Sequence, residues 1–178
     1  MVLDETLVMV TVREAGPADE VAVEAVWAAV AAEAEWIGTE FPLHAGWGDR
    51  FQAALTAPQS TWFVAEVEGH VVGGVFVQDS RGLAHLGMAV LESNRGAGLG
   101  RSLLNAAVAW ASDHDCHKVT LEVWPHNTRA RRLYESGGFS DEGHLRRHYR
   151  RKSGALWDAV VMALILDHDS PGRGADRP

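Results

Sequence analysis

A glycine-rich segment, Arg95-Gly96-Ala97-Gly98-Leu99-Gly100-Arg101, stands between an apolar strand pattern and an amphipathic helix pattern. Glycine at alternate positions lets successive backbone N–H groups turn toward one ligand, and a helix N-terminus favours an anion. Arg95 and Arg101 can add positive charge. The segment therefore predicts a pyrophosphate cradle, with a plain strand-to-helix turn as the alternative. A P-loop and a dinucleotide fingerprint are excluded, because no Gly-Lys-Ser/Thr follows and Arg101 stands where a glycine is needed.

Two polar residues interrupt apolar strand patterns and are candidate bases. Glu122 lies among Val119, Leu121, Val123 and Trp124. We expect such a carboxylate to be desolvated, which would make it a stronger base. A carboxylate that pairs with an arginine or opens to a cleft is the alternative. His85 has a titration range that suits a base, and a packed or surface histidine is the alternative reading.

The elements that must position these groups follow from periodicity. The patterns predict strands at 7–13, 61–67, 70–78, 83–90, 118–124, 139–144 and 156–166, and helices at 16–35, 49–56, 100–112 and 128–136. Glu68-Gly69 predicts a tight hairpin turn. The order β-α-α-β-β-β-α-β-α-β-β predicts an α/β fold with a mixed sheet and helices on both faces.

Length and composition limit the organisation. The 178 residues, 47% of them hydrophobic, predict a single domain over 1–169 and a disordered tail over 170–178. No apolar run reaches the roughly 20 residues of a membrane helix, and Asp4 and Glu5 stand where a signal peptide would be basic. We expect a cytoplasmic protein that does not enter a membrane.

A metal site is not expected. The single cysteine, Cys116, excludes a disulfide framework within the chain and a zinc site of several thiolates. Asp113-His114-Asp115-Cys116-His117 contains ligand-type side chains, but adjacent residues of one short connector seldom converge on one ion. The connector is interpreted as a solvated loop with one semi-buried thiol.

Charge is unevenly distributed along the chain, whose net charge is −8. Residues 1–94 hold 14 Asp and Glu against 3 Lys and Arg, whereas residues 95–178 hold 10 against 13. The overall acidity argues against general nucleic-acid binding. A basic run, which lacks stacking aromatics apart from Tyr149, is interpreted as a solvated hairpin and consists of Arg146, Arg147, Arg150, Arg151 and Lys152. Glu33, Glu35 and Glu40 could steer a cationic acceptor to a cleft.

Two motifs carry a family resemblance. Arg95-x-x-Gly98-x-Gly100 after a strand resembles the acetyl-CoA signature of the GNAT N-acetyltransferases, and residues 127–139, NTRARRLYESGGF, resemble the N-x-x-A-x-x-L-Y-x-x-x-G-F element of that family. The resemblance covers 10–166, because the predicted strand order is also similar to that of the family. The segments 142–146 and 158–164 resemble the ribosomal-protein and small-amine branches. The departures are Gly137-Gly138 and the corner Trp124-Pro125-His126, which could reshape an acceptor cleft.

The resemblance implies a largely antiparallel GNAT-like sheet and direct transfer of acetyl from acetyl-CoA, a co-substrate, to a primary amine without a metal. It implies that the backbone of Met88, Ala89 and Val90 pairs with the pantetheine arm, and that the Val90 N–H holds the thioester carbonyl. Arg95, Gly96, Ala97, Gly98, Leu99, Gly100 and Arg101 would then hold the pyrophosphate. Asn127 would hold the CoA arm, cap the following helix, or do both.

The same resemblance assigns proton transfer. Tyr134 is the implied general acid, since a phenol keeps its proton at pH 7, and packing beside Leu133 is its alternative role. In the ribosomal-protein branch a glutamate twelve residues before the tyrosine is the proposed base acting through water, and Glu122 stands at that spacing. His85 or water alone are the other candidates.

Several alternatives stay open at this point. A non-catalytic acyl-CoA-binding or sensor domain would keep the cradle but would be expected to lose Tyr134 or Glu122, and both are present. A nucleic-acid-binding module using the basic run is a further rival. The acceptor amine is a protein N-terminus, a lysine, an antibiotic, a polyamine or an amino-acid analogue. The family resemblance is compatible with a homodimer, which no sequence feature establishes.

Overall fold

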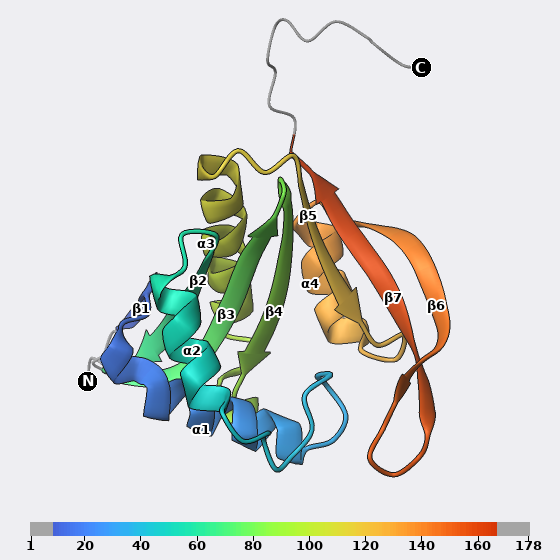
Figure 1. The fold of residues 1–178 in the computed structure, drawn as a ribbon, viewed down its shortest axis with the longest axis horizontal. Coiled ribbons are helices and arrows are strands. Elements are labelled where there is room, and N and C mark those ends of the chain that lie inside the picture. The colour runs from blue at the N-terminus through green and yellow to red at the C-terminus, as the bar shows by residue number, and fades with distance from the viewer. Residues whose placement is uncertain (1–8, 167–178) are drawn as a thin grey trace, which may run out of the picture.

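Seven strands form one sheet in the computed structural model, which describes residues 9–166 (Figure 1). The spatial order is β1-β2-β3-β4-β5-β7-β6. The strands are β1 (Val10–Glu14), β2 (Ser60–Val67), β3 (His70–Ser80), β4 (Leu83–Val90), β5 (Lys118–Val123), β6 (Ser140–Arg150) and β7 (Leu156–Ile165). All neighbours are antiparallel except β4 and β5, which run parallel. The predicted mixed, largely antiparallel sheet is confirmed.

Helices cover both faces of this sheet, as predicted (Figure 1). The helices are α1 (Glu20–Ala32), α2 (Trp47–Thr56), α3 (Leu99–Asp113) and α4 (Thr128–Ser136), with short 3₁₀ turns at Pro17–Asp19 and Glu92–Asn94. One apolar cluster joins α3 and α4 to the sheet and includes Leu103, Leu104 and Val119. A second cluster joins α1 and α2 to the opposite face and contains Trp27, Phe51 and Trp62. Burial of both stripes fixes the helices to the sheet.

The turn between β2 and β3 has the backbone conformation that the sequence predicts. Glu68 and Gly69 both have positive φ, 51° and 79°. Two successive residues with positive φ make the two-residue turn whose twist matches that of paired strands. The predicted hairpin at this position is therefore confirmed.

Element ends differ from prediction where the backbone changes direction. The first helix ends at Ala32 rather than at residue 35, and Ala34 has a left-handed φ of 58° that a helix cannot continue through. The sixth strand runs to Arg150 rather than to 144. This edge strand has two register shifts against β7, so its side chains do not alternate regularly and its length was hidden. Residues 7–8 and the predicted tail 170–178 lie outside the described residues.

No helix within residues 9–166 is long and apolar enough to cross a membrane.

Candidate functional site

The parallel pair in the centre of the sheet opens into a cavity. Strands β4 and β5 pair only at Leu83–His85 and Lys118–Thr120, and beyond that point they diverge (Figure 1). A cavity of about 1370 Å³ occupies this gap. Its walls bring together most of the predicted site residues: Met88, Ala89, Val90, Arg95, Gly96, Gly98, Gly100, Arg101, Glu122, Asn127 and Tyr134. Of the remaining two, Ala97 is exposed on the loop, and the Leu99 side chain is buried in the core, so only their backbones can serve a ligand.

The glycine loop has the geometry of an anion cradle. Gly96 and Gly98 have positive φ, 88° and 84°, and Gly98 is the N-cap residue of α3. The backbone N–H groups of residues 96–100 meet no acceptor among residues 9–166, and the first hydrogen bond of the helix is made by Arg101 N–H to the Gly98 carbonyl at 3.0 Å. A Cβ added at Gly96 or Gly98 would meet nothing within 4 Å. Open space faces unpaired donors at a helix N-terminus, an arrangement that fits a pyrophosphate.

Gly100 has a different reason to be glycine. A Cβ at this position would stand 3.0 Å from Cδ2 of Leu133, on α4. The residue therefore allows close packing of α3 against α4. It contributes its backbone N–H to the cradle, but its missing side chain serves the helix contact.

The two arginines of the loop are both held by protein groups, but only Arg95 is in an ion pair. Arg95 donates from Nε to the Val90 carbonyl at 2.9 Å and binds both carboxylate oxygens of Glu33 at 2.6 and 2.8 Å. That hydrogen bonding lowers the pKa of Glu33. Arg101 donates to the carbonyl of Ser136 at 2.8 Å and to its hydroxyl. The charge of Arg95 is thus paired with Glu33, whereas Arg101 is held by neutral groups and keeps its positive charge at the cavity wall.

Two exposed arginines that sequence reasoning missed line the cavity from α4. Arg129 and Arg132 both lie in its wall. The signal was present, because both fall inside the segment 127–139 that resembles the second family motif. Both arginines stand at variable positions of that motif, for which the motif implies no role.

The exposed edge of β4 presents N–H groups to the cavity. The Leu91 N–H donates to the Val72 carbonyl on β3 at 2.9 Å. Because the N–H groups of a strand alternate in direction, those of Met88 and Val90 face the other way, toward the gap beside β5. Arg95 occupies the Val90 carbonyl on that side and leaves its N–H to a ligand.

Tyr134 is packed in the core and also lines the cavity. Only 8% of the residue is exposed, its ring lies 5.9 Å from that of Phe139, and it lines the cavity. Burial raises the pKa of Tyr134 to about 12. Its hydroxyl therefore keeps a proton at any physiological pH.

Glu122 is not desolvated, contrary to the sequence-based expectation. Its side chain is 38% exposed, because it points to the face of the sheet that α1 and α2 leave open beside β5. The carboxylate oxygen Oε2 accepts a hydrogen bond from the Tyr149 hydroxyl at 2.6 Å, and Nε2 of His148 lies 4.0 Å away. A tyrosine, rather than an arginine, is thus the partner of this carboxylate.

Tyr149 is a site residue that the sequence did not reveal. Burial and the bond to Glu122 raise the pKa of Tyr149 to about 12, so its hydroxyl acts as the donor. It stands opposite Trp157 after a register shift in β6. No local pattern shows where such a shift falls, so the pairing of Tyr149 with Glu122 could not be read from spacing.

His85 lies in a different part of the surface from Tyr134. It lines a second cavity of about 520 Å³, which Glu122 and Tyr149 also line. Glu122 is therefore in the wall of both cavities, whereas His85 does not reach the one that holds Tyr134. Glu122 therefore shares a cavity with Tyr134, and His85 does not.

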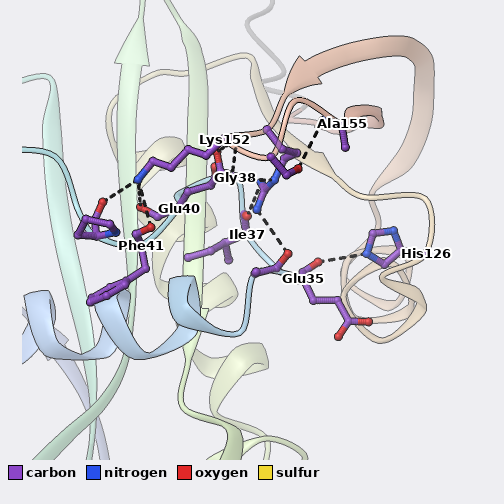
Figure 2. Close-up of polar contacts among 12 residues, drawn as sticks. Glu35, Ile37, Gly38, Glu40, Phe41, His126, Lys152 and Ala155 are labelled. Atoms are coloured by element: carbon purple, nitrogen blue, oxygen red, sulfur yellow. Dashed lines mark hydrogen bonds and ion pairs between the residues drawn. The ribbon is translucent and has the colours of Figure 1, made fainter.

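Asn127 caps α4, one of the two roles predicted for it. Its Oδ1 accepts from the Ala130 N–H at 3.2 Å, and its Nδ2 donates to the Trp36 carbonyl at 3.3 Å. His126, in the corner that departs from the family pattern, contacts the Glu35 carbonyl through Nε2 at 3.1 Å. The start of α4 is thereby attached to the loop that follows α1, as Figure 2 shows for His126 and Glu35.

Two sequence-based expectations about charged residues near the α1–α2 loop are wrong. Arg151 is 5% exposed and pairs with Glu40 at 3.3 Å, so the basic run is not simply a solvated hairpin. Glu33 and Glu40 are both in ion pairs, and their charges are not free to steer a cation. Among residues 9–166, Glu35 is the one member of that acidic trio without an ion pair.

The connector 113–117 is a packed turn. His114 stacks on Trp110 at 3.9 Å and contacts its carbonyl through Nδ1. Cys116 is buried, more so than the expected semi-buried thiol, and that burial raises its pKa to about 11. In the described part of the chain, no three His, Cys, Asp or Glu side chains gather as a metal-ligand set.

Comparisons with known proteins agree with this geometry. The sequence profile of the acetyltransferase (GNAT) family matches residues 27–139. An N-alpha-acetyltransferase of Sulfurisphaera tokodaii is 33% identical over 130 residues, covering 65% of this chain and 75% of the relative. The crystal structure of a ribosomal-protein-alanine N-acetyltransferase from Brucella melitensis has 26% identity and a TM-score of 0.79, covering 88% of this chain and 99% of that one.

A structure from Salmonella typhimurium, described as that of an acetyltransferase with its cofactor acetyl-CoA, has 25% identity and a TM-score of 0.79. The likeness covers 92% of this chain and 98% of that one. The splayed strands, the glycine loop and the length of the profile match agree on one assignment. The chain belongs to the GNAT family and is an N-acetyltransferase.

Proposed function

We propose that the protein transfers acetyl from acetyl-CoA directly to a primary amine, and that the α-amine of a protein N-terminus is the acceptor. One observation carries the proposal. A single cavity is lined by the unpaired N–H cradle of residues 96–100, by Tyr134 with its retained proton, and by the carboxylate of Glu122. The same cavity can thus bind an anionic carrier and transfer protons to and from the reacting groups.

The donor is bound mainly by backbone groups. The N–H groups of residues 96–100 hold the pyrophosphate, and exposed Arg129 and Arg132 add charge nearby. The free edge of β4 pairs with the pantetheine arm as an added strand would. The Val90 N–H then donates to the thioester carbonyl, where negative charge develops during attack by the amine.

Two side chains move the protons. Glu122 accepts a proton from the acceptor ammonium through water, while the Tyr149 hydroxyl holds its Oε2 and leaves the other oxygen available. The neutral amine attacks the thioester carbon, the carbon–sulfur bond breaks, and Tyr134 donates its proton to the departing thiolate. The nitrogen gives its second proton to water as the amide forms, and Glu122 returns its own proton to solvent. Bulk solvent returns the proton to Tyr134, whose pKa of about 12 keeps it protonated between turnovers.

The names of two relatives support a protein α-amine. One relative is an N-alpha-acetyltransferase and another is a ribosomal-protein-alanine N-acetyltransferase. A free amino acid would present a carboxylate beside its amine; Lys152 in the cavity wall is engaged by protein oxygens, so the exposed Arg50 in that wall is the cation that free alanine in the panel below would test. A peptide presents an amide there instead.

The test is release of free thiol from acetyl-CoA in the presence of an amine panel. The panel holds a short peptide with a free N-terminal alanine, the same peptide with a blocked N-terminus and one lysine, a polyamine, and free alanine. We expect turnover with the first and little with the others. Turnover with the lysine peptide or the polyamine instead would reject the α-amine, and turnover with none, despite a thermal shift by acetyl-CoA, would favour the binding or sensor role.

A further inference from the structure

The loop between α1 and α2 forms a wall of the cavity without regular structure of its own. Residues 33–46 contain no helix or strand, yet Trp36, Ile37, Gly38, Thr39 and Glu40 line the cavity. A loop of this length needs contacts from elsewhere to keep one conformation. Figure 2 shows that such contacts come from the turn between β6 and β7 and from His126, at the start of α4.

Arg151 supplies the central contacts. Its Nε pairs with Oε1 of Glu40 at 3.3 Å, and its terminal nitrogens donate to the carbonyls of Ile37, Gly38 and Ala34 at 3.3, 3.4 and 3.5 Å. Its guanidinium also lies 4.5 Å from the ring centre of Trp157 and 5.4 Å from that of Trp124. A planar group with five donors suits such convergence of carbonyls and a carboxylate better than an ammonium would.

Lys152 holds the next stretch of the same loop. Its backbone N–H donates to the Glu40 carboxylate at 3.0 and 3.2 Å. Its Nζ donates to the carbonyls of Glu40, Phe41 and Pro42 at 3.4, 3.2 and 3.0 Å (Figure 2). The Lys152 ammonium group is therefore hydrogen-bonded to backbone oxygens of the loop.

The turn that carries both residues is itself closed. The Arg151 N–H donates to the Ala155 carbonyl, and the Gly154 N–H donates back to the Arg151 carbonyl, both at 2.8 Å. Arg151 and Lys152 thus extend from a hydrogen-bonded turn.

The same hairpin also holds the candidate base. Tyr149, two residues before Arg151, donates to Glu122 and packs edge-to-face on Trp124 at 5.0 Å. Trp124 in turn lies against the Arg151 guanidinium. Displacement of Arg151 would therefore disturb both the α1–α2 loop and the residues that surround the Glu122 carboxylate.

We propose that Arg151, Lys152 and Glu40, named the clamp, are positioning residues that set the shape of the acceptor wall and so determine which amines fit. The inference rests on the proposed function, because it takes the side of the cavity lined by the α1–α2 loop as the acceptor side. Arg151 is not among the residues that line the cavity, so its effect on an acceptor is indirect. It acts through the loop whose backbone oxygens it binds.

The test compares Arg151→Met with Arg150→Met in steady-state kinetics with the N-terminal alanine peptide and acetyl-CoA. Methionine keeps an unbranched stem and removes every donor. Arg150 is an exposed neighbour whose side chain makes no hydrogen bond or ion pair with residues 9–166, so its variant controls for loss of one charge. We expect Arg151→Met to raise the peptide KM by about tenfold or more, with the acetyl-CoA KM changed less than about twofold.

Hydrogen exchange gives a second readout. Amides of residues 33–46 should exchange faster in Arg151→Met, whereas amides of α3 keep wild-type rates. Arg151→Lys, which keeps the charge but loses the fork, should recover part of the peptide KM. If Arg151→Met does not fold, Lys152→Met provides the same comparison, because its side chain is exposed and contacts only the loop.

Three results would overturn the proposal. The first is an unchanged peptide KM in the folded variant, and the second is an equal rise in both KM values, which would mean general loosening. The third is absence of transfer by the wild-type protein, in which case the proposed function fails first and the positioning role with it. Turnover of the wild type separates the two failures.

Discussion

We call the side of the cavity where acetyl-CoA is proposed to bind the donor side, and the side lined by the α1–α2 loop the acceptor side. On the donor side, residues 88–101 supply backbone N–H groups that lie close together in sequence. On the acceptor side, Arg151 contacts Ile37 across 114 positions, and Lys152 reaches Glu40 across 112. The donor side depends on turn conformation and strand edges, which many side chains tolerate. The acceptor side depends on particular pairs of side chains, so a single substitution can change it.

Glu33 and Arg95 join the two sides. Glu33 follows α1 at the start of the acceptor loop, and Arg95 begins the glycine loop and holds the Val90 carbonyl. The pair ties the position of the wall to the edge of β4. The two sides are built differently, and the Glu33–Arg95 ion pair fixes their relative position.

The largest effect is expected for Tyr134→Phe, which removes one hydroxyl between the two sides. We expect kcat to fall by about 10² to 10⁴, the usual contribution of a general acid, because the thiolate then leaves without its proton donor. The ring remains packed against Phe139, so the thermal shift produced by acetyl-CoA should be retained. Wild-type kcat in this variant would remove Tyr134 from the mechanism.

Glu122→Gln should act on the acceptor side alone. We expect kcat/KM for the alanine peptide to fall by about 10² at pH 7 and to recover in part near pH 9, where an α-amine, with pKa about 8, is already neutral. Acetyl-CoA binding should not change. His85→Gln is the control, and a larger pH-dependent loss there would make His85 the base; a pH-independent loss in Glu122→Gln would make Glu122 a binding residue.

The difference in construction also explains what could be read from the sequence. The strand order, the hairpin at Glu68-Gly69 and the glycine loop depend on neighbours in the chain, and all three are present in the structure. The glycine loop at 95–101 was predicted as an anion cradle for the same reason, whereas Met88, Ala89 and Val90 were expected from the family resemblance, and Arg129 and Arg132 were not predicted.

The acceptor side resisted prediction because its partners are remote. The burial of Arg151 depends on Glu40, on three carbonyls and on two tryptophan rings, and no local pattern joins them. The exposure of Glu122 follows from where α1 and α2 stop covering the sheet. The bond from Tyr149 needs a register shift in β6 that its charged sequence conceals.

Gly98→Val should break the donor side alone. Valine is strained at φ 84° and fills the open space in front of the N–H groups. A ligand at a hundredfold excess over its Kd stabilises the native state by roughly 2.7 kcal/mol, and we expect the variant to lose this shift with acetyl-CoA. Gly69→Val is the matched control, since Gly69 also has a positive φ of 79° and open space but lies in the β2–β3 turn. Equal shifts in both variants would reject the cradle.

The smallest effect is expected for Glu33→Gln, which neutralises the ion pair between the two sides. Arg95 lowers the pKa of Glu33, so the carboxylate stabilises the folded state above its unfolded pKa of about 4.3, and this contribution is lost as pH falls through the lower folded value. We expect the variant to be less stable than wild type by about 1 kcal/mol at pH 7, with the difference shrinking at pH 4 and below. Urea unfolding at several pH values measures this difference. Glu35→Gln, at an exposed position without an ion pair in residues 9–166, should show little difference at any pH. A Glu33→Gln difference that stays constant from pH 7 to pH 3 would show that the amide loses packing rather than charge, and the two sides would then be joined by shape alone.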